Sequence, residues 1–289
     1  MDTAIINIPD AVNGYVDLVQ HVLKHGKEAA PRGMKTREIE DAVIRIEDIK
    51  HTLPLGVGRG TVPGIGAVEA CQLLAGAATP KLVIAVGPMF KNYAEDNGMF
   101  HGAYGARTQD QYGPIIERLK NDPDSRQAVV TIWDPVLDLL PEKRDYPCTI
   151  LHQFRIRDNK LNMSVYMRSN DVWLGAAYDF FQFTRVQIAV ASVLGIAPGS
   201  YTHHVGSLHI YEQHYDAAES LKYTTEPYED IPAITGFNWR QVQDRALSSL
   251  SAAMHIEEPM LVNSLHPFEG WYARAMITAI KKNEAKTNG

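Results

Sequence analysis

Stretches with the spacing of helices and stretches with the composition of strands follow one another along the whole 289-residue chain. Apolar residues from Val12 to Leu23 recur at helical spacing, and Asp10 stands before them as a capping residue. Residues 37–48 are rich in β-branched residues and partly alternate, which predicts a strand. No linker, repeat period or low-complexity block interrupts this mixture. We therefore expect one domain over residues 1–289, of the α/β (α+β) class, with a mixed β-sheet and packed helices.

Further segments predict the same mixture. The stretch 178–194 is almost continuously apolar and ends at Gly195, with Pro198 just beyond, which is the pattern of a helix stop. Residues 149–157 and 161–168 have strand character and are joined by turn residues at 158–160, which predicts a hairpin. We also expect helices at 67–76, 110–120, near 212–222 and at 239–254, strands at 81–86, 127–133 and 201–211, and a tail at 281–289.

The balance of charged residues excludes several classes of function. Lysine plus arginine number 28 against 34 for aspartate plus glutamate, so the net charge is −6. A chain with this charge does not work mainly by neutralising the phosphates of nucleic acid or of a membrane surface, although it leaves room for a local basic pocket. No apolar run approaches the ~20 residues that span a bilayer. We expect no nucleic-acid partner and no membrane partner.

Cysteine usage and the N-terminal residues indicate the compartment. Only Cys71 and Cys148 occur, which is too few for a disulfide framework and fits a reducing compartment. The first residues carry an early acid and no basic flank, unlike a signal peptide. We therefore expect a cytoplasmic protein.

Three familiar kinds of site, namely phosphate-binding loops, metal sites and serine hydrolase sites, are not matched by their motifs. The glycines between positions 56 and 66 fit neither G-x-x-x-x-G-K-[ST] nor G-x-G-x-x-G, so we interpret them as a loop ahead of a helix. His203 and His204 would point to opposite faces of a strand, and the sequence has no HExxH or CxxC spacing, so we expect no metal. The G-x-S-x-G motif of many serine hydrolases does not occur.

Cys148 stands directly before a predicted strand, in the sequence YPCT. A single cysteine is more often an inert buried thiol than a nucleophile, but the residues that follow change this interpretation. About twenty residues on, Arg168 and Ser169 place a cation beside a hydroxyl, and Asn170 and Asp171 come next. This grouping favours a reactive cysteine.

This combination resembles the thymidylate synthase superfamily over roughly residues 10–215. That family has a P-C pair, an R-S-x-D-x-x-L-G segment about twenty residues on, and an H-x-Y pair near the end of its core. The matching segments here are 147–148, 168–175 and 209–211. Upstream landmarks also fit, namely Arg126 in NDPDSR, Tyr104-Gly105 after YAEDNG, and a helical Glu69. The resemblance implies a thymidylate-synthase-like fold and transfer of a one-carbon unit to a pyrimidine nucleotide.

Within the superfamily, the chain is similar to the cytidylate hydroxymethylase branch. Asp179 stands where thymidylate synthases carry an asparagine that reads uracil. A carboxyl group can instead accept N4–H of cytosine on one oxygen and share a proton with N3 through the other. Thr149 replaces the histidine that commonly follows the nucleophile, and Phe90 and Tyr93 replace two tryptophans beside the folate. The resemblance therefore implies 5-hydroxymethylation of CMP or dCMP with 5,10-methylenetetrahydrofolate and water, without a metal.

The resemblance also implies a role for each matching residue. Cys148 adds to C6 of the pyrimidine, Glu69 acts as general acid and base, and Tyr104 lies near the C5 proton. Asp179 reads the base, and Arg126 reaches the substrate from the partner subunit, which implies a homodimer. The remaining candidates contact the phosphate (Arg32, Arg168, Ser169), the sugar 3′-hydroxyl (His209, Tyr211) and the folate (Asp171, Phe90, Tyr93).

Two other functions stay open. A thymidylate synthase acting on dUMP would carry an amide at the base-reading position and would form dihydrofolate. A catalytically inactive nucleotide-binding protein on the same fold would need no nucleophile. Within the hydroxymethylase, Ala176 and Ala177 stand where relatives carry bulkier side chains. The lost bulk would make room for a 2′-hydroxyl, so CMP is as eligible a substrate as dCMP.

Overall fold

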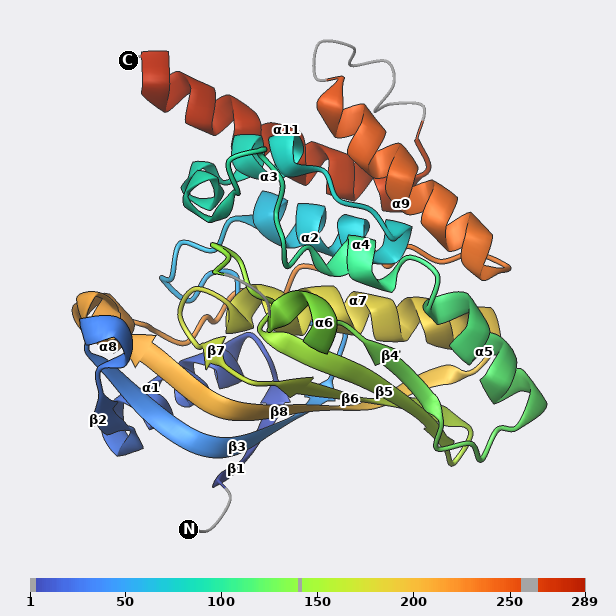
Figure 1. Cartoon of the computed structure of the whole chain (residues 1–289), viewed down its shortest axis with the longest axis horizontal. Coiled ribbons are helices and arrows are strands. Elements are labelled where there is room, and N and C mark those ends of the chain that lie inside the picture. The colour runs from blue at the N-terminus through green and yellow to red at the C-terminus, as the bar shows by residue number, and fades with distance from the viewer. Residues whose placement is uncertain (1–3, 140–141, 256–264, 289) are drawn as a thin grey trace.

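The computed structural model describes residues 4–139, 142–255 and 265–288, and within them a mixed sheet lies beneath stacked helices (Figure 1). The strand order is β1-β3-β8-β6-β5-β4, with β2 on β3 and β7 on β8. The pairs β1–β3, β6–β8 and β7–β8 are parallel, whereas the other pairs are antiparallel. The strands are β1 (Ala4–Asp10), β2 (Lys27–Ala29), β3 (Thr36–Asp48), β4 (Ala128–Thr131), β5 (Thr149–Arg157), β6 (Lys160–Met167), β7 (Asn170–Asp171) and β8 (Ala197–Tyr211).

The helices cover one face of this sheet in layers. In Figure 1, α7 lies directly over the strands, α2 lies above α7, and α9 and α11 lie above α2. The long helices are α1 (Asn13–His25), α2 (Pro63–Ala75), α5 (Tyr112–Asn121), α7 (Ala176–Leu194), α9 (Trp239–Met254) and α11 (Pro267–Asn288). The short ones are α3 (Pro80–Val86), α4 (Tyr104–Thr108), α6 (Pro135–Asp138), α8 (Tyr215–Glu219) and the 3₁₀ segments η1 (Pro31–Gly33), η2 (Pro88–Tyr93) and η3 (Glu212–His214).

The fold class and most elements predicted from the sequence are confirmed. The apolar stretch forms α7, most of whose side chains are buried, and it ends at Gly195 with a left-handed φ of 70°. The hairpin of β5 and β6 turns at Asp158 and Asn159, whose φ values are 52° and 55°. Aspartate and asparagine tolerate this conformation, which a two-residue turn between twisted strands requires. The helices at α1, α2, α5 and α9 lie where their spacing placed them.

Three local predictions are wrong. Residues 81–86, predicted as a strand, belong to the helix α3, because Pro80 begins a helical turn and a short apolar run does not distinguish a strand from a buried helix. Residues 281–289, predicted as a tail, continue α11 as far as Asn288. The predicted helix near 212–222 is reduced to η3 and the short α8.

The glycine-rich segment is a loop only in its first half. Gly56, Gly58 and Gly60 have left-handed φ values of 73–87°, which fits a tight loop before a helix. Gly64 instead lies inside α2, where a β-carbon would come within 2.7 Å of the Ala275 carbonyl oxygen and of the Ala279 side chain in α11. The missing side chain therefore lets α11 approach α2 closely. None of the helices in the described ranges has the length and apolar character needed to cross a membrane.

Candidate active site

The hairpin of β5 and β6 brings Cys148 and Arg168 together. Cys148 precedes β5 and Arg168 follows β6, so the two residues are neighbours at the open end of the hairpin. Arg168 N–H donates to the Cys148 carbonyl oxygen over 2.9 Å. Its guanidinium donates to the Pro147 carbonyl oxygen over 3.0 Å and lies 3.6 Å from the Cys148 sulfur. The spacing of about twenty residues in the sequence is therefore the length of one hairpin.

Burial and neighbouring charges act on the pKa of the Cys148 thiol in opposite directions. Burial raises its pKa above the usual value, and the positive charge of Arg168 acts in the lowering direction. The negative charges of Asp179, Asp145 and Asp171 also raise this pKa, which places these carboxyls within electrostatic reach of the sulfur. Arg168 is the cation that contacts the sulfur, so it is the group that favours the thiolate.

A second contact joins two more of the sequence motifs. The short strand β7, which contains Asn170 and Asp171, pairs in parallel with β8 at Leu208 and His209. Val172 N–H donates to the His209 carbonyl oxygen over 2.7 Å. The R-S-x-D segment and the H-x-Y pair, about forty residues apart in the chain, are therefore adjacent in the structure.

Asp171 carries one free carboxylate oxygen. Its Oδ1 accepts from the backbone N–H groups of Trp173 and Leu174, over 2.8 and 3.0 Å. Its Oδ2 is buried and has no hydrogen-bond partner within the described part of the chain. Burial raises the pKa of Asp171, while the neighbouring His209 and His214 act in the lowering direction. A buried, unpartnered acceptor is costly unless a ligand satisfies it, so Oδ2 is fitted to receive an N–H group.

Asp179 and Glu69 face each other across the packed helices α7 and α2. Asn170 Nδ2 donates to Asp179 Oδ2 over 2.7 Å, and Gln182 Nε2 donates to Asp179 Oδ1 over 3.0 Å. Gln182 Nε2 also lies 3.5 Å from Glu69 Oε2. Burial raises the pKa of Asp179 to about 7. Burial and the charge of Asp179 raise the pKa of Glu69 to about 8, so both carboxyls can hold a proton near neutral pH.

Tyr104 lies within electrostatic reach of both Cys148 and Asp179. Thr149 N–H, one residue after the cysteine, donates to its hydroxyl oxygen over 3.3 Å. The ring stacks on Phe183 with centroids 6.2 Å apart. Burial raises the pKa of Tyr104 well above its usual value, and the charges of Cys148 and Asp179 act in the same direction. The tyrosine therefore keeps its proton and offers a neutral hydroxyl beside the cysteine.

Tyr93 and Asp171, two of the predicted folate-binding residues, lie near Arg32, one of the predicted phosphate-binding residues. Burial is the largest cause that raises the pKa of Tyr93, and the charges of Asp171 and Tyr211 raise it further. The charge of Arg32 acts in the lowering direction. Phe90 packs beside Tyr93 with ring centroids 6.5 Å apart. Arg32 itself is exposed in η1 and has a left-handed φ of 54°. These residues gather from η1, η2, β7 and the end of β8 around one region.

Arg126 is not brought to this region in its own chain. It lines a surface hollow of ≈ 380 Å³ with Gln153, Arg155 and Arg157 from β5. Gln153 donates to the Arg126 carbonyl oxygen over 3.3 Å, and it lies five residues along β5 from Cys148. At ~3.3 Å per residue of strand, that separation is roughly 17 Å. Within its own chain, Arg126 therefore lies well away from the cysteine.

These arrangements agree with comparisons against known proteins. Residues 13–251 match the model of the thymidylate synthase family. The chain belongs to the thymidylate synthase family. It is also 32% identical, over 241 residues, to the "Deoxyuridylate hydroxymethyltransferase" of Bacillus phage SP01. That alignment covers 78% of this chain and 61% of the relative, so the chain spans less than two thirds of the relative's length.

Two residues of this family member were missed by sequence reasoning. Gln182 contacts both carboxyls of the site, and its spacing of three residues from Asp179 on a predicted helix was the available signal. Arg59 donates to the Trp173 carbonyl oxygen over 2.8 Å, and its guanidinium lies 4.8 Å from the centroid of the Tyr178 ring. Its charge acts on Glu69, in the direction that lowers the pKa. No motif marks this arginine in the glycine-rich loop.

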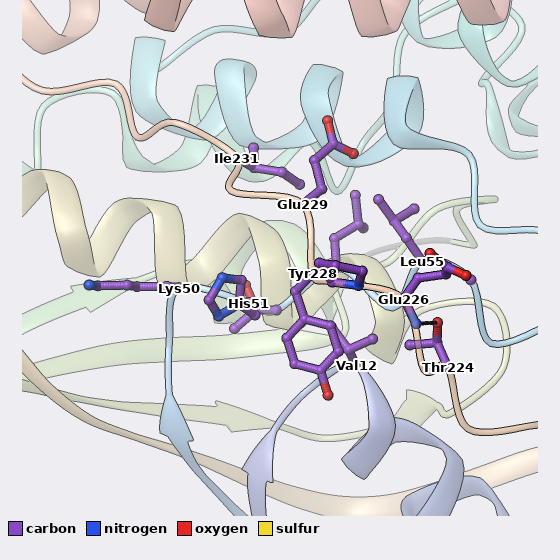
Figure 2. A pocket seen from close by; sticks show the side chains of 13 residues that line it. Val12, Lys50, His51, Leu55, Thr224, Glu226, Tyr228, Glu229 and Ile231 are labelled. Carbon is purple, nitrogen blue, oxygen red and sulfur yellow. Dashed lines mark hydrogen bonds between the residues drawn. The ribbon is translucent and has the colours of Figure 1, made fainter.

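Other features lie apart from this site. A hollow of ≈ 140 Å³ lies between residues 50–56 and 224–231, and Figure 2 shows His51 and Tyr228 side by side there. Its lining contains none of the residues matched to the family's site, so we assign it to the packing of these two segments. Across the described ranges, no three His, Cys, Asp or Glu side chains are placed to hold a metal ion.

Proposed function

We propose that the protein is a pyrimidine nucleotide C5-hydroxymethyltransferase that converts CMP or dCMP to the 5-hydroxymethyl nucleotide. The observation that carries this proposal is the carboxyl group of Asp179, which accepts N–H donors from Asn170 and Gln182. Each oxygen retains a lone pair for the base, so one can accept N4–H of cytosine. With its pKa raised to about 7, the carboxyl can also supply the proton that bridges its other oxygen to N3.

Cys148 is the nucleophile in this proposal. Its thiolate adds to C6 of the pyrimidine, which makes C5 nucleophilic, and the C6–S bond breaks again when the product forms. Arg168, 3.6 Å from the sulfur, favours the thiolate that begins the reaction. The neutral hydroxyl of Tyr104 lies beside the cysteine and is placed to receive or relay the proton from C5.

In this proposal, Glu69 acts as the general acid and activates the water molecule in the last step. Its pKa of about 8 keeps it protonated near neutral pH, where it can act as an acid and, after losing its proton, activate water. Water then supplies the hydroxyl group, and tetrahydrofolate leaves without oxidation. This outcome separates a hydroxymethylase from a thymidylate synthase, in which a hydride completes a methyl group.

The folate co-substrate fits the residues around β7. 5,10-Methylenetetrahydrofolate supplies the one-carbon unit when bound. The buried Oδ2 of Asp171 lacks a partner in the described chain and can accept an N–H of the pterin ring. Phe90 and Tyr93 lie beside it as half-exposed aromatic walls, suited to stack on flat rings.

Arginine side chains would bind the nucleotide phosphate. Arg168, Ser169 and Arg32 belong to the same chain as the cysteine, and the partner subunit would supply its own copy of Arg126. A homodimer is therefore part of the proposal, with the uncovered face of the sheet, where Arg126 lies, toward the partner. His209 and Tyr211 at the end of β8 would hydrogen-bond the sugar 3′-hydroxyl. The small side chains of Ala176 and Ala177, at the start of α7, would leave room for a 2′-hydroxyl.

A second candidate, 5-hydroxymethylation of dUMP, comes from the printed name of the phage relative. Both candidates release the C5 hydrogen to solvent without forming dihydrofolate, so the test compares bases. We expect release of tritium from [5-³H]dCMP or [5-³H]CMP with methylenetetrahydrofolate to exceed release from [5-³H]dUMP. Faster release from dUMP would replace the proposal with the second candidate. A rise in the absorbance of dihydrofolate would indicate a thymidylate synthase.

A further inference from the structure

A chain of hydrogen bonds fixes the direction in which Asn170 faces Asp179. When Asp179 is ionised its oxygens only accept, so the Asn170 amide turns its NH₂ group toward Asp179 Oδ2, 2.7 Å away. Its Oδ1 then faces His203 Nε2 over 3.1 Å. His203 is fully buried, and burial lowers its pKa to about 3, so the ring is neutral and has a single N–H. That proton must be on Nε2, because Oδ1 accepts.

The far side of the His203 ring closes the chain. Its Nδ1, which has no proton in this tautomer, accepts from the Tyr201 hydroxyl over 2.7 Å. Tyr201 is fully buried as well. The donors therefore run in one direction, from Tyr201 through His203 and Asn170 to Asp179. Turning the Asn170 amide round would require the His203 proton to move from Nε2 to Nδ1, so that the Tyr201 hydroxyl would accept instead of donate.

On the other side of Asp179, Gln182 also turns its NH₂ group toward the carboxyl. Its Nε2 lies between Asp179 Oδ1, 3.0 Å away, and Glu69 Oε2, 3.5 Å away. Turning this amide would set its carbonyl oxygen against Asp179 Oδ1. Both oxygens of the side chain at position 179 therefore meet N–H donors. Such a setting suits a group that accepts on both sides, and a buried donor without an acceptor costs ~1–3 kcal/mol.

We propose that Asn170 and Gln182 are positioning residues that determine base specificity by admitting a carboxyl group, and disfavouring an amide, at position 179. An amide, the group that reads uracil, would have to point its own NH₂ at one of the two donors. The inference rests on the proposed function in one respect, that residue 179 reads the base. It assigns cytosine recognition to the surroundings of Asp179 as well as to Asp179 itself.

The test compares Asp179→Asn with the double variant Asn170→Asp/Asp179→Asn. In the double variant, the carboxylate at 170 accepts from both the amide at 179 and His203, so the same hydrogen bond forms with reversed direction. Equilibrium binding of dCMP and dUMP, measured by calorimetry without folate, reports base preference independently of chemistry. We expect Asp179→Asn to weaken dCMP binding by roughly 100-fold, and the double variant to bind dUMP at least about 10-fold more tightly than Asp179→Asn.

Two further variants protect the comparison. Asn170→Ala/Asp179→Asn removes the donor without adding a charge, and we expect a smaller gain in dUMP affinity in the same direction. It answers the question if the double exchange does not fold. Asn121→Asp makes the same chemical change on the exposed end of α5 and should leave both affinities unchanged.

Equal dUMP affinities for Asp179→Asn and for both double variants would overturn this inference. Preference of the wild-type protein for dUMP over dCMP would contradict the proposed function instead. The two failures are therefore separate results of one set of measurements.

Discussion

The two ends of the proposed nucleotide site are built in opposite ways. At the base-reading end, Asp179 is buried and both of its oxygens have partners before any ligand binds. At the phosphate end, Arg32, Arg126 and Arg168 are exposed. The first two make no side-chain hydrogen bond or ion pair within the described ranges, and Arg168 bonds only to backbone oxygens and the cysteine sulfur.

This difference assigns separate tasks to the two ends. A buried carboxyl whose oxygens already accept hydrogen bonds from the protein can discriminate between bases, because a wrong hydrogen-bond pattern leaves a polar group without a partner. Exposed arginines discriminate little, but they attract and hold any nucleotide phosphate and remain sensitive to salt. We therefore expect changes at the base end to alter which nucleotide binds, and changes at the phosphate end to alter how tightly any nucleotide binds.

The largest effect is expected from Cys148→Ala, which removes the proposed nucleophile. Release of the C5 hydrogen should fall by roughly 10⁴-fold or more, because the proposed mechanism begins with addition of this sulfur to C6. Binding of dCMP, measured by calorimetry, should change only a few-fold, since both ends remain. Residual release above ~1% of the wild-type rate would contradict a covalent role for the sulfur.

A smaller effect is expected from Arg126→Gln at the phosphate end. Loss of a charge-assisted hydrogen bond should lower kcat/KM by ~10–100-fold for every nucleotide, with the preference between bases unchanged. A purified mixed dimer of Arg126→Gln with Cys148→Ala should regain about half of the wild-type activity, because one of its two sites is complete. A mixed dimer as inactive as its parents would show that the arginine acts within its own chain.

The pH dependence of binding tests the base end alone. Asp179, whose pKa is raised to about 7, holds a proton below that pH, and in the proposed complex it would share this proton with N3 of cytosine. Above that pH the proton is lost, so dCMP affinity should fall by up to ~10-fold per pH unit. Asp179→Asn should abolish this dependence. Glu69→Gln should leave the pH dependence in place, which would show that it does not come from Glu69, whose pKa is about 8. A flat profile in the wild-type protein would contradict the proton-sharing role.

The smallest effect is expected from salt. Raising the ionic strength from ~0.05 to ~0.5 M should weaken the binding of both dCMP and dUMP by a few-fold, because the arginines at the phosphate end are exposed. The ratio of the two affinities should stay constant, because the base end is buried. A ratio that changes with salt would show that the exposed charges contribute to base discrimination.

The sequence predicted the parts of the fold that depend on local pattern. The hairpin at Asp158 and Asn159 and the stop of α7 at Gly195 are encoded by the residues at the turn itself. The helical identity of residues 81–86 could not be predicted in this way. It depends on packing against α2 and α11, which a short apolar run does not reveal.

The contacts of the candidate site also differ in whether they follow from a local sequence pattern or from packing between distant segments. Cys148 and Arg168 meet because the hairpin predicted from the sequence joins the segments that carry them. The sequence did not predict that Gln182 and Arg59 contact the acidic groups, since those contacts depend on how α2, α7 and the glycine-rich loop pack together. The direction of the hydrogen bonds from Tyr201 to Asp179 depends on burial of His203, which no local pattern reports.

The most direct test of the central claim is mass analysis of the products formed from CMP, dCMP and dUMP with 5,10-methylenetetrahydrofolate. We predict that CMP or dCMP gains ~30 Da, the mass of a hydroxymethyl group replacing hydrogen, and that dUMP is a poor substrate. A gain of ~14 Da on dUMP, the mass of a methyl group replacing hydrogen, would contradict the account, as would a 30 Da gain confined to dUMP.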